Sequence, residues 1–193
     1  MHNIVLFGPP GVGKGTQSQY LIERYALVHI APGDLLRAQI KQNTPLGQQT
    51  AEYINNGKLA PDTLVTDIVF QAIAAHRHSP GFLFDGFPRT MVQAQSLPSK
   101  MADLHLDIDA VIFIDAPEEA LLQRIKLRAQ SAGRTDDQDD EKVATRMRTY
   151  LQDTLPVAQY YAQQGKLHKV DGMGTVEEVF SRIVAVLSPL SQA

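Results

Sequence analysis

The segment GPPGVGKGT, residues 8–16, has the residue types of a loop that binds phosphate groups. Gly8, Gly11 and Gly13 permit positive φ and close approach of the backbone, so that successive N–H groups can face a polyphosphate. Lys14 adds a cation, and the start of the following helix adds its dipole. The segment follows an apolar strand and precedes a helical pattern, and this context favours a phosphate loop over an ordinary glycine-rich turn.

The loop departs from the usual pattern at one position. A Ser or Thr usually follows the lysine, and its hydroxyl binds Mg²⁺. Here Gly15 follows Lys14 and the hydroxyl comes one residue later, at Thr16. If the loop serves a metal-bound nucleotide, another group has to organise the metal.

A second candidate site is FDGFPRT, residues 84–90. Asp85 follows an apolar strand directly, where a carboxylate can serve Mg²⁺ itself or through water. The glycine and proline that come next predict a tight turn that presents Arg89, and the alternative is a turn with a surface arginine. Asp115 is a rival carboxylate at the end of another strand, but a cap on the helix that follows is its favoured role.

Arginines are numerous enough to neutralise the charge of phosphate groups. Besides Arg89, the candidates for this role are Arg37, Arg124, Arg128, Arg134, Arg146 and Arg148. Arg124 and Arg128 are four residues apart and share one helix face. A lone helix arginine is usually a solvated ion-pair partner, so the argument depends on the whole set, in which Arg148 is the weakest candidate. Planar guanidinium groups suit phosphoryl transfer, and an acceptor that is itself a phosphate needs no general base.

Composition narrows the class of protein. The chain has 193 residues, a net charge of −3 and no cysteine, which excludes disulfides and thiolate metal sites. There is no block of basic residues for nucleic acid, no apolar run of membrane-spanning length and no signal peptide, so a cytoplasmic enzyme is expected. His76 and His78 lack a third metal ligand at a sensible spacing. No Asn-Lys-x-Asp motif is present, which weakens a GTPase interpretation.

The elements that must position these residues follow from hydrophobic periodicity. Short apolar runs alternate with amphipathic ones, which predicts βαβ units and a parallel sheet. The expected strands are 4–7, 28–30, 82–84, 111–114 and 167–170. The expected helices are 13–25, 63–75, 90–101, 117–129, 141–164 and 176–187. Thr175 and Glu178 have the spacing of a capping box, and Pro156 should kink the longest helix.

Two stretches, 34–56 and 128–141, are too polar to be helices that cover a sheet. They are interpreted as flaps over a rigid core, with Pro45 suited to a helix start.

Taken together, GPPGVGKGT, APGDLLR, GKLAPD, FDGFPRTMVQAQ and AGRTDD resemble the adenylate kinase family over nearly the whole chain, in order and with suitable spacing. The resemblance implies an α/β fold, a P-loop doubly wound five-stranded parallel sheet with helices on both faces. It also implies a core of residues 1–30, 61–126 and 139–193, an insertion at 31–60 that binds the nucleoside monophosphate, and a short lid at 127–138.

The activity that the resemblance implies is reversible phosphoryl transfer from ATP to AMP, giving two ADP, in adenine nucleotide homeostasis and salvage. Mg²⁺ accompanies ATP, zinc is not expected, and the enzyme is expected to be a cytoplasmic monomer with no nucleic-acid or membrane partner. A non-catalytic nucleotide-binding regulator is a second hypothesis, which the set of arginines disfavours.

The resemblance also carries site residues onto this sequence. ATP would be held by Gly11, Val12, Gly13, Lys14, Gly15, Thr16, Arg128 and Gly174. AMP would be held by Pro32, Arg37, Lys58, Leu59, Ala60, Gly86, Phe87, Pro88, Arg89, Gln93, Arg134 and Arg146. Gln93 would read the adenine, and Lys14, Arg89, Arg128, Arg134 and Arg146 would neutralise the reacting phosphates. Asp85 would organise the water around Mg²⁺, which is how the family manages with Gly15 after the lysine.

One departure from the family concerns the acceptor base. The family usually has Ser-Thr-Gly-Asp where this chain has APGD, residues 31–34, and UMP/CMP kinases also lack the threonine. Pro32 therefore leaves a pyrimidine acceptor as the alternative. Thr90 and Gln93 follow the adenylate pattern, and a side-chain amide can discriminate strongly between bases, so AMP is the expected acceptor.

Overall fold

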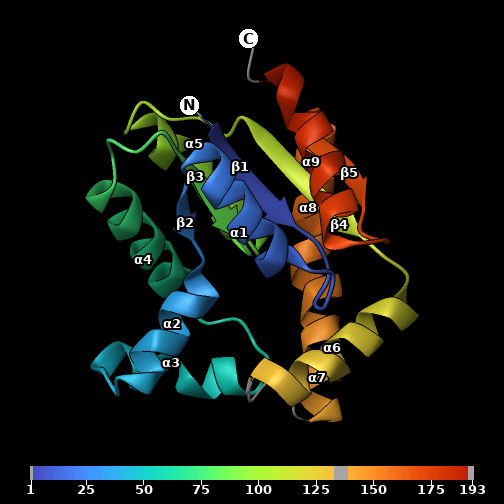
Figure 1. Cartoon of the computed structure of the whole chain (residues 1–193). Coiled ribbons are helices and arrows are strands. Elements are labelled where there is room, and N and C mark those ends of the chain that lie inside the picture. Colours follow the sequence, from blue (N-terminus) through green and yellow to red (C-terminus); the bar gives the residue numbers. More distant parts are fainter. Residues whose placement is uncertain (1, 133–138, 191–193) are drawn as a thin grey trace.

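The computed structural model describes residues 2–132 and 139–190, and a parallel sheet forms its centre (Figure 1). The strands are β1 (His2–Phe7), β2 (Val28–Ile30), β3 (Gly81–Asp85), β4 (Ala110–Asp115) and β5 (Leu167–Asp171). Their spatial order is β2-β3-β1-β4-β5, and every pair is parallel. The predicted five-stranded parallel sheet is confirmed, and four of the strands extend one or two residues beyond the predicted ends.

Side chains alternate between the two faces of the sheet along each strand, and apolar side chains occur on both faces. Helices therefore cover both faces. Val5 and Phe7 enter one apolar cluster with α4 (Asp62–Ala75), α5 (Met91–Ala102) and α8 (Leu155–Gln163). Ile4 and Leu6 enter the other cluster with α1 (Lys14–Tyr25), α6 (Glu118–Ala132) and α9 (Val176–Leu190). Burial of each such side chain contributes about 1.5–3 kcal/mol, so the two clusters hold the strand ends rigidly.

The switch in strand order lies at β1, which pairs with β3 on one side and with β4 on the other. Ligands of open parallel sheets bind beyond the carboxyl ends of the strands at such a point. The phosphate loop follows β1 there, and Asp85 ends β3 opposite Leu6.

The polar stretch 34–56 is helical for the most part. It forms most of α2 (Pro32–Lys41) and all of α3 (Pro45–Asn55), which lie with α7 (Asp140–Thr149) at the end of the molecule to which the strands point (Figure 1). Pro45 starts α3, as predicted, and the Oγ1 of Thr44 caps it by accepting a hydrogen bond of 3.1 Å from the N–H of Gly47. Pro32 occupies the equivalent first turn of α2, where its fixed φ suits a helix start.

The long helix predicted over 141–164 is divided. Between α7 and α8 the residues Tyr150–Thr154 form a π-helical turn. Pro156 follows this turn and has no N–H to donate to the preceding turn, which accounts for the altered hydrogen bonding there.

Side-chain caps are present at the starts of two further helices. The Oγ1 of Thr175 accepts from the N–H of Glu178 at 3.2 Å, and Glu178 accepts in return from the N–H of Thr175 at 2.8 Å, so the capping box is confirmed. Thr90 caps α5 through its hydrogen bond from the N–H of Gln93. No helix in the described ranges is long and apolar enough to cross a membrane.

Candidate active site

The phosphate loop has the backbone that its glycines were expected to provide. Gly8, Gly11 and Gly13 have φ values of 149°, 85° and 102°. Gly13 caps α1 in the left-handed conformation, and a Cβ on Gly11 would lie 2.7 Å from the carbonyl oxygen of Leu121. The loop is therefore pressed against its surroundings, with the N-terminus of α1 directed at its centre.

Lys14 folds back over this loop. Its Nζ donates to the carbonyl oxygens of Gly8 at 2.6 Å and Pro9 at 3.0 Å. Burial lowers the pKa of Lys14 to about 7. Asp85 acts to raise this pKa, whereas the nearby guanidinium groups of Arg89, Arg146 and Arg128 lower it further. Burial is the main cause of this lowered pKa, and the three arginines add positive charge beside the loop, which suits a site for polyphosphate.

Asp85 is held by two neighbours at the end of β3. The Oγ of Ser18 donates to its Oδ2 at 2.9 Å, and the Nε2 of His29 lies 3.4 Å from the same oxygen. Burial acts to raise the pKa of Asp85, but the hydrogen bond from His29, the charge of Lys14 and the hydrogen bond from Ser18 together lower it. The carboxylate is thus kept ionised in the site.

One continuous pocket of about 700 Å³ lies beyond the strand ends and takes in most of the expected site residues. It is lined on the donor side by Gly11, Val12, Gly13, Lys14, Gly15, Thr16, Arg128 and Gly174. It is lined on the acceptor side by Pro32, Arg37, Lys58, Leu59, Ala60, Gly86, Arg89, Gln93 and Arg146. Asp85 also lines the pocket. The volume lies within the range of sites for small molecules.

The acceptor side of the pocket contains one contact between distant segments and one local ion pair. Gly57 has a φ of 71°, and a Cβ there would lie 2.6 Å from the Cγ of Arg146. The stem of Arg146 therefore runs against the segment that leads into Lys58. Arg37 forms an ion pair with Asp34 one turn earlier in α2.

Gln93 is 2% exposed, yet it lines the pocket, and both ends of its carboxamide are engaged. Its Oε1 accepts from the N–H of Arg89 at 2.7 Å, and its Nε2 donates to the Oδ1 of Asp62 at 2.7 Å. The Oγ1 of Thr90 donates to the same Oδ1 at 2.9 Å. These bonds join the turn after β3 to the start of α4.

Some predicted residues lie elsewhere. Phe87 and Pro88 do not line the pocket, and the ring of Phe87 is buried in the core, 6.4 Å from that of Phe84. Both residues anchor the turn that carries Arg89. Arg148 donates to Thr145 on its own helix. Arg134 lies outside the described residues.

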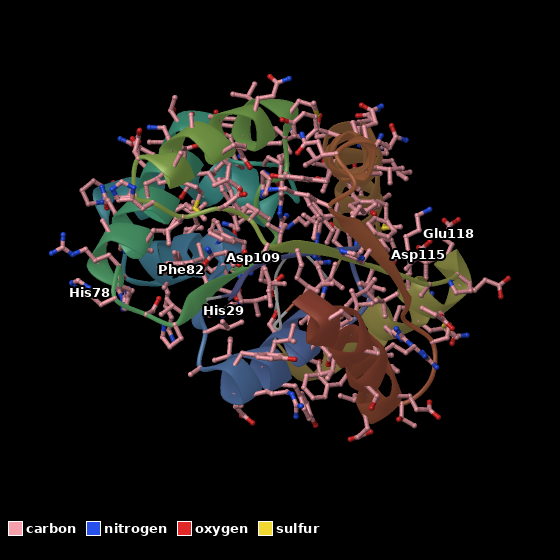
Figure 2. The ribbon with its side chains drawn as sticks, turned by 90° about the horizontal axis from the view of Figure 1, so that it is seen from above. His29, His78, Phe82, Asp109, Asp115 and Glu118 are labelled. Atoms are coloured by element: carbon pink, nitrogen blue, oxygen red, sulfur yellow. The ribbon has the colours of Figure 1, made fainter. Side chains whose placement is uncertain are left out.

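Asp115 is not a competing site carboxylate. It does not line the large pocket, and Figure 2 shows it beside Glu118, well away from His29. The helix cap predicted for it is also wrong, because α6 begins at Glu118 and the Oδ1 of Asp115 accepts from the N–H of Ala116 instead.

Sequence reasoning missed several residues that position the site. Arg124 was noted only as a neighbour of Arg128, but it donates to the carbonyl oxygens of Val12 and Gly172. Gln17 donates to the carbonyl of Val176 at 2.9 Å and so ties α1 to the same end of the pocket. Ser18 and Asp62 support Asp85 and Gln93. No local motif marks these residues, because their partners are 31 to 159 residues away.

Comparison with known proteins agrees with this geometry. The sequence model of the family "Adenylate kinase" matches residues 6–166. An adenylate kinase of Flavobacterium johnsoniae is 41% identical over 190 residues, which cover 98% of this chain and 100% of the relative. Those of Flavobacterium psychrophilum and Phocaeicola vulgatus are 42% and 40% identical over the same shares of each chain. The chain therefore belongs to the adenylate kinase family, whose members are phosphotransferases that act between ATP and AMP.

Proposed function

We propose that this chain transfers the terminal phosphoryl group of Mg-ATP to AMP, giving two ADP, within the pocket beyond the strand ends. The observation that carries the proposal is the continuity of this pocket, which the phosphate loop and the acceptor residues Arg37 and Gln93 line together. Two nucleotides bound end to end would bring their phosphates together beside Lys14 and Arg89.

On the donor side, the N–H groups of the phosphate loop and Lys14 would bind the ATP phosphates. In the described structure Lys14 Nζ bonds to the carbonyls of Gly8 and Pro9, so ATP would exchange these neutral acceptors for charged oxygens. Gly174 lines the same pocket, and its backbone would contact ATP.

The residues present fit a hydrated Mg²⁺. Asp34 and Asp85 are the acidic residues among those that line the pocket, and Asp34 is paired with Arg37. One carboxylate besides the paired Asp34 is too few for a protein cage, but it suits an ion that keeps most of its waters and is held mainly by nucleotide phosphates. Asp85 would orient those waters, and the ion would supply charge neutralisation on the phosphates.

Arg89, Arg128 and Arg146 would neutralise the charge that moves from donor to acceptor. All three line the pocket, and the charge of each acts to lower the pKa of Lys14. The acceptor oxygen of a nucleoside monophosphate is already ionised, and transfer then needs positioning and electrostatic stabilisation without a general base.

On the acceptor side, Arg37 would bind the AMP phosphate and Gln93 the base. The segment 31–60 would supply most of this site, and residues 127–138 with Arg134 would cover the donor and limit loss of ATP to water. Pro32 lies at the first turn of α2 and lines the pocket, so it would shape the space beside the acceptor base.

The test is ADP formation by purified protein from Mg-ATP with AMP, CMP, UMP or GMP. We expect AMP to be the preferred acceptor. Lys14→Met and Arg89→Ala should each lower kcat with AMP by about 10²-fold or more, because each removes a cation from the reacting phosphates.

Arg148→Ala is the matched control, since Arg148 is an exposed arginine outside the pocket lining, and its activity should stay at the wild-type level. Near-normal ADP formation by either site variant would contradict its assigned role, and preference for a pyrimidine acceptor would contradict AMP.

A further inference from the structure

Asp62 does not line the pocket, but it contacts a residue of the proposed acceptor site. It is the first residue of α4 and does not line the pocket, whereas Gln93, to which it is bonded, does. The Oδ1 of Asp62 accepts two hydrogen bonds, from Gln93 Nε2 at 2.7 Å and from Thr90 Oγ1 at 2.9 Å.

The two partners of the Gln93 carboxamide permit only one orientation. Ionised Asp62 can only accept hydrogen bonds, and the main-chain N–H of Arg89 can only donate. Rotation of the carboxamide by 180° would set oxygen against the Asp62 carboxylate and N–H against the Arg89 N–H. Because Gln93 is buried, water does not compensate for these losses, and the rotated state is strongly disfavoured.

The hydrogen-bonding positions of this carboxamide that remain unused are one donor and one acceptor, each at a fixed place. Its nitrogen has a second hydrogen and its oxygen a second lone pair, and neither is used in a hydrogen bond among the described residues. The side chain therefore offers one donor and one acceptor at fixed positions on the pocket wall. Adenine matches such a pair through N1, an acceptor, and the 6-amino group, a donor.

A 6-oxopurine has the opposite polarity at the same edge, since N1 carries a hydrogen and C6 carries an oxygen. A freely rotating carboxamide would accept either base by turning over. We propose that Asp62 determines the selectivity for a 6-aminopurine acceptor by fixing the orientation of the Gln93 carboxamide. This inference rests on the proposed function, in which Gln93 faces the acceptor base.

Inosine monophosphate (IMP) is the probe that isolates this effect. It differs from AMP only at N1 and C6, and it lacks the 2-amino group through which GMP could be rejected by size. The measured quantity is the ratio of kcat/KM for AMP to kcat/KM for IMP, at saturating Mg-ATP, in the full chain and its variants.

Asp62→Ala should lower this ratio by about tenfold, and by no less than about fivefold, because the N–H of Arg89 alone then opposes the rotated orientation of Gln93. The KM for ATP should stay within about twofold of the wild-type value, since the donor side is untouched; a general disturbance of the fold would change both. Asp67→Ala, an exposed aspartate on the same helix, is the matched control and should leave the ratio unchanged.

Asp62→Asn is the isosteric variant for the case in which Asp62→Ala does not fold. Its amide can either accept from or donate to Gln93, so it should lower the ratio by at least about twofold with little loss of stability. An unchanged ratio in Asp62→Asn would then overturn the inference, as would a fall of less than fivefold in folded Asp62→Ala.

Gln93→Ala separates this inference from the proposed function. If Gln93→Ala loses the selectivity and Asp62→Ala keeps it, Gln93 reads the base and Asp62 does not orient it, so only the inference fails. If Gln93→Ala keeps the selectivity, or wild-type protein forms no ADP from AMP, the proposed acceptor site fails and the inference fails with it.

Discussion

The Nη2 of Arg124 lies 3.1 Å from the carbonyl oxygen of Gly172, and the Nη1 of the same guanidinium lies 3.2 Å from the carbonyl oxygen of Val12. One side chain of α6 therefore joins the phosphate loop to the loop after β5. Because both loops line the donor end of the pocket, their separation is set by a planar group of fixed geometry.

Arg124→Lys should weaken ATP binding selectively. A single ammonium cannot donate to two carbonyl groups with the fork geometry of a guanidinium, so one loop would lose its tether. We expect the KM for ATP to rise by about ten- to a hundredfold, as for loss of one charged hydrogen bond, with the KM for AMP within about twofold. Arg148→Lys is the control in steady-state kinetics. Equal effects on the two KM values would show that Arg124 does not act on the donor loops.

Asp85→Asn should raise the concentration of Mg²⁺ needed for half-maximal activity. The substitution keeps the shape of the side chain but removes the charge that Lys14 and Ser18 stabilise. Groups that orient a metal's waters typically contribute about 10- to 100-fold in metal affinity, so a shift of about tenfold is expected in a Mg²⁺ titration. Asp115→Asn changes the carboxylate at the end of β4, outside the large pocket, and should not shift the titration. A similar shift in both variants would argue against a local role of Asp85.

ATP binding should take up a proton above pH 7. The pKa of Lys14 is lowered to about 7 in the free protein, and the negative phosphates of ATP favour its charged form and raise this pKa. Below pH 7 the lysine is already charged, so binding needs no proton. Above pH 7 each binding event must charge it, and affinity should fall by up to about tenfold per pH unit until the pKa of the bound state is reached.

Calorimetry with a non-hydrolysable ATP analogue, in two pH 8 buffers of different ionisation enthalpy, measures this proton uptake. It should be close to one in the wild type and absent in Lys14→Met. The absence of proton uptake by the wild type at pH 8 would show that free Lys14 is already charged.

Two glycines of the phosphate loop should differ in how they tolerate alanine. Gly8 and Gly13 both have positive φ, which costs an alanine about 1–2 kcal/mol. A Cβ on Gly13 has no neighbour within 4 Å among the described residues, whereas one on Gly8 would collide with the carbonyl oxygen of Ile114 in β4. Gly8→Ala should therefore lose at least about 3 kcal/mol in urea unfolding, and Gly13→Ala only the smaller backbone cost. Equal losses would contradict the packing of Gly8 against β4.

Local features of the sequence were enough to predict much of the fold. The strands follow from short apolar runs, and the phosphate loop follows from glycines between a strand and a helix, because periodicity and backbone sterics act over a few residues. The same is true of the Thr175–Glu178 capping box. The resemblance to a known family then supplied Gln93 and the expected role of Arg146, which no local pattern distinguishes from ordinary polar residues.

The stretch 34–56 shows the limit of the local argument. Its polarity was correctly taken to mean that it does not cover the sheet, but α2 and α3 are regular helices, since proline starts and helix-forming residues suffice for helicity.

The sequence by itself determined which residues carry the charge, namely Lys14, Asp85 and the arginines, and which ends of strands and helices bear them. The tertiary structure alone decided how they are held: Ser18 against Asp85, Arg124 across two loops, and Asp62 against Gln93. The physical reason is the distance along the chain over which each kind of interaction acts. Strand and helix patterns depend on neighbours along the chain, whereas each of these hydrogen bonds joins elements that meet only after the sheet has ordered β1 between β3 and β4.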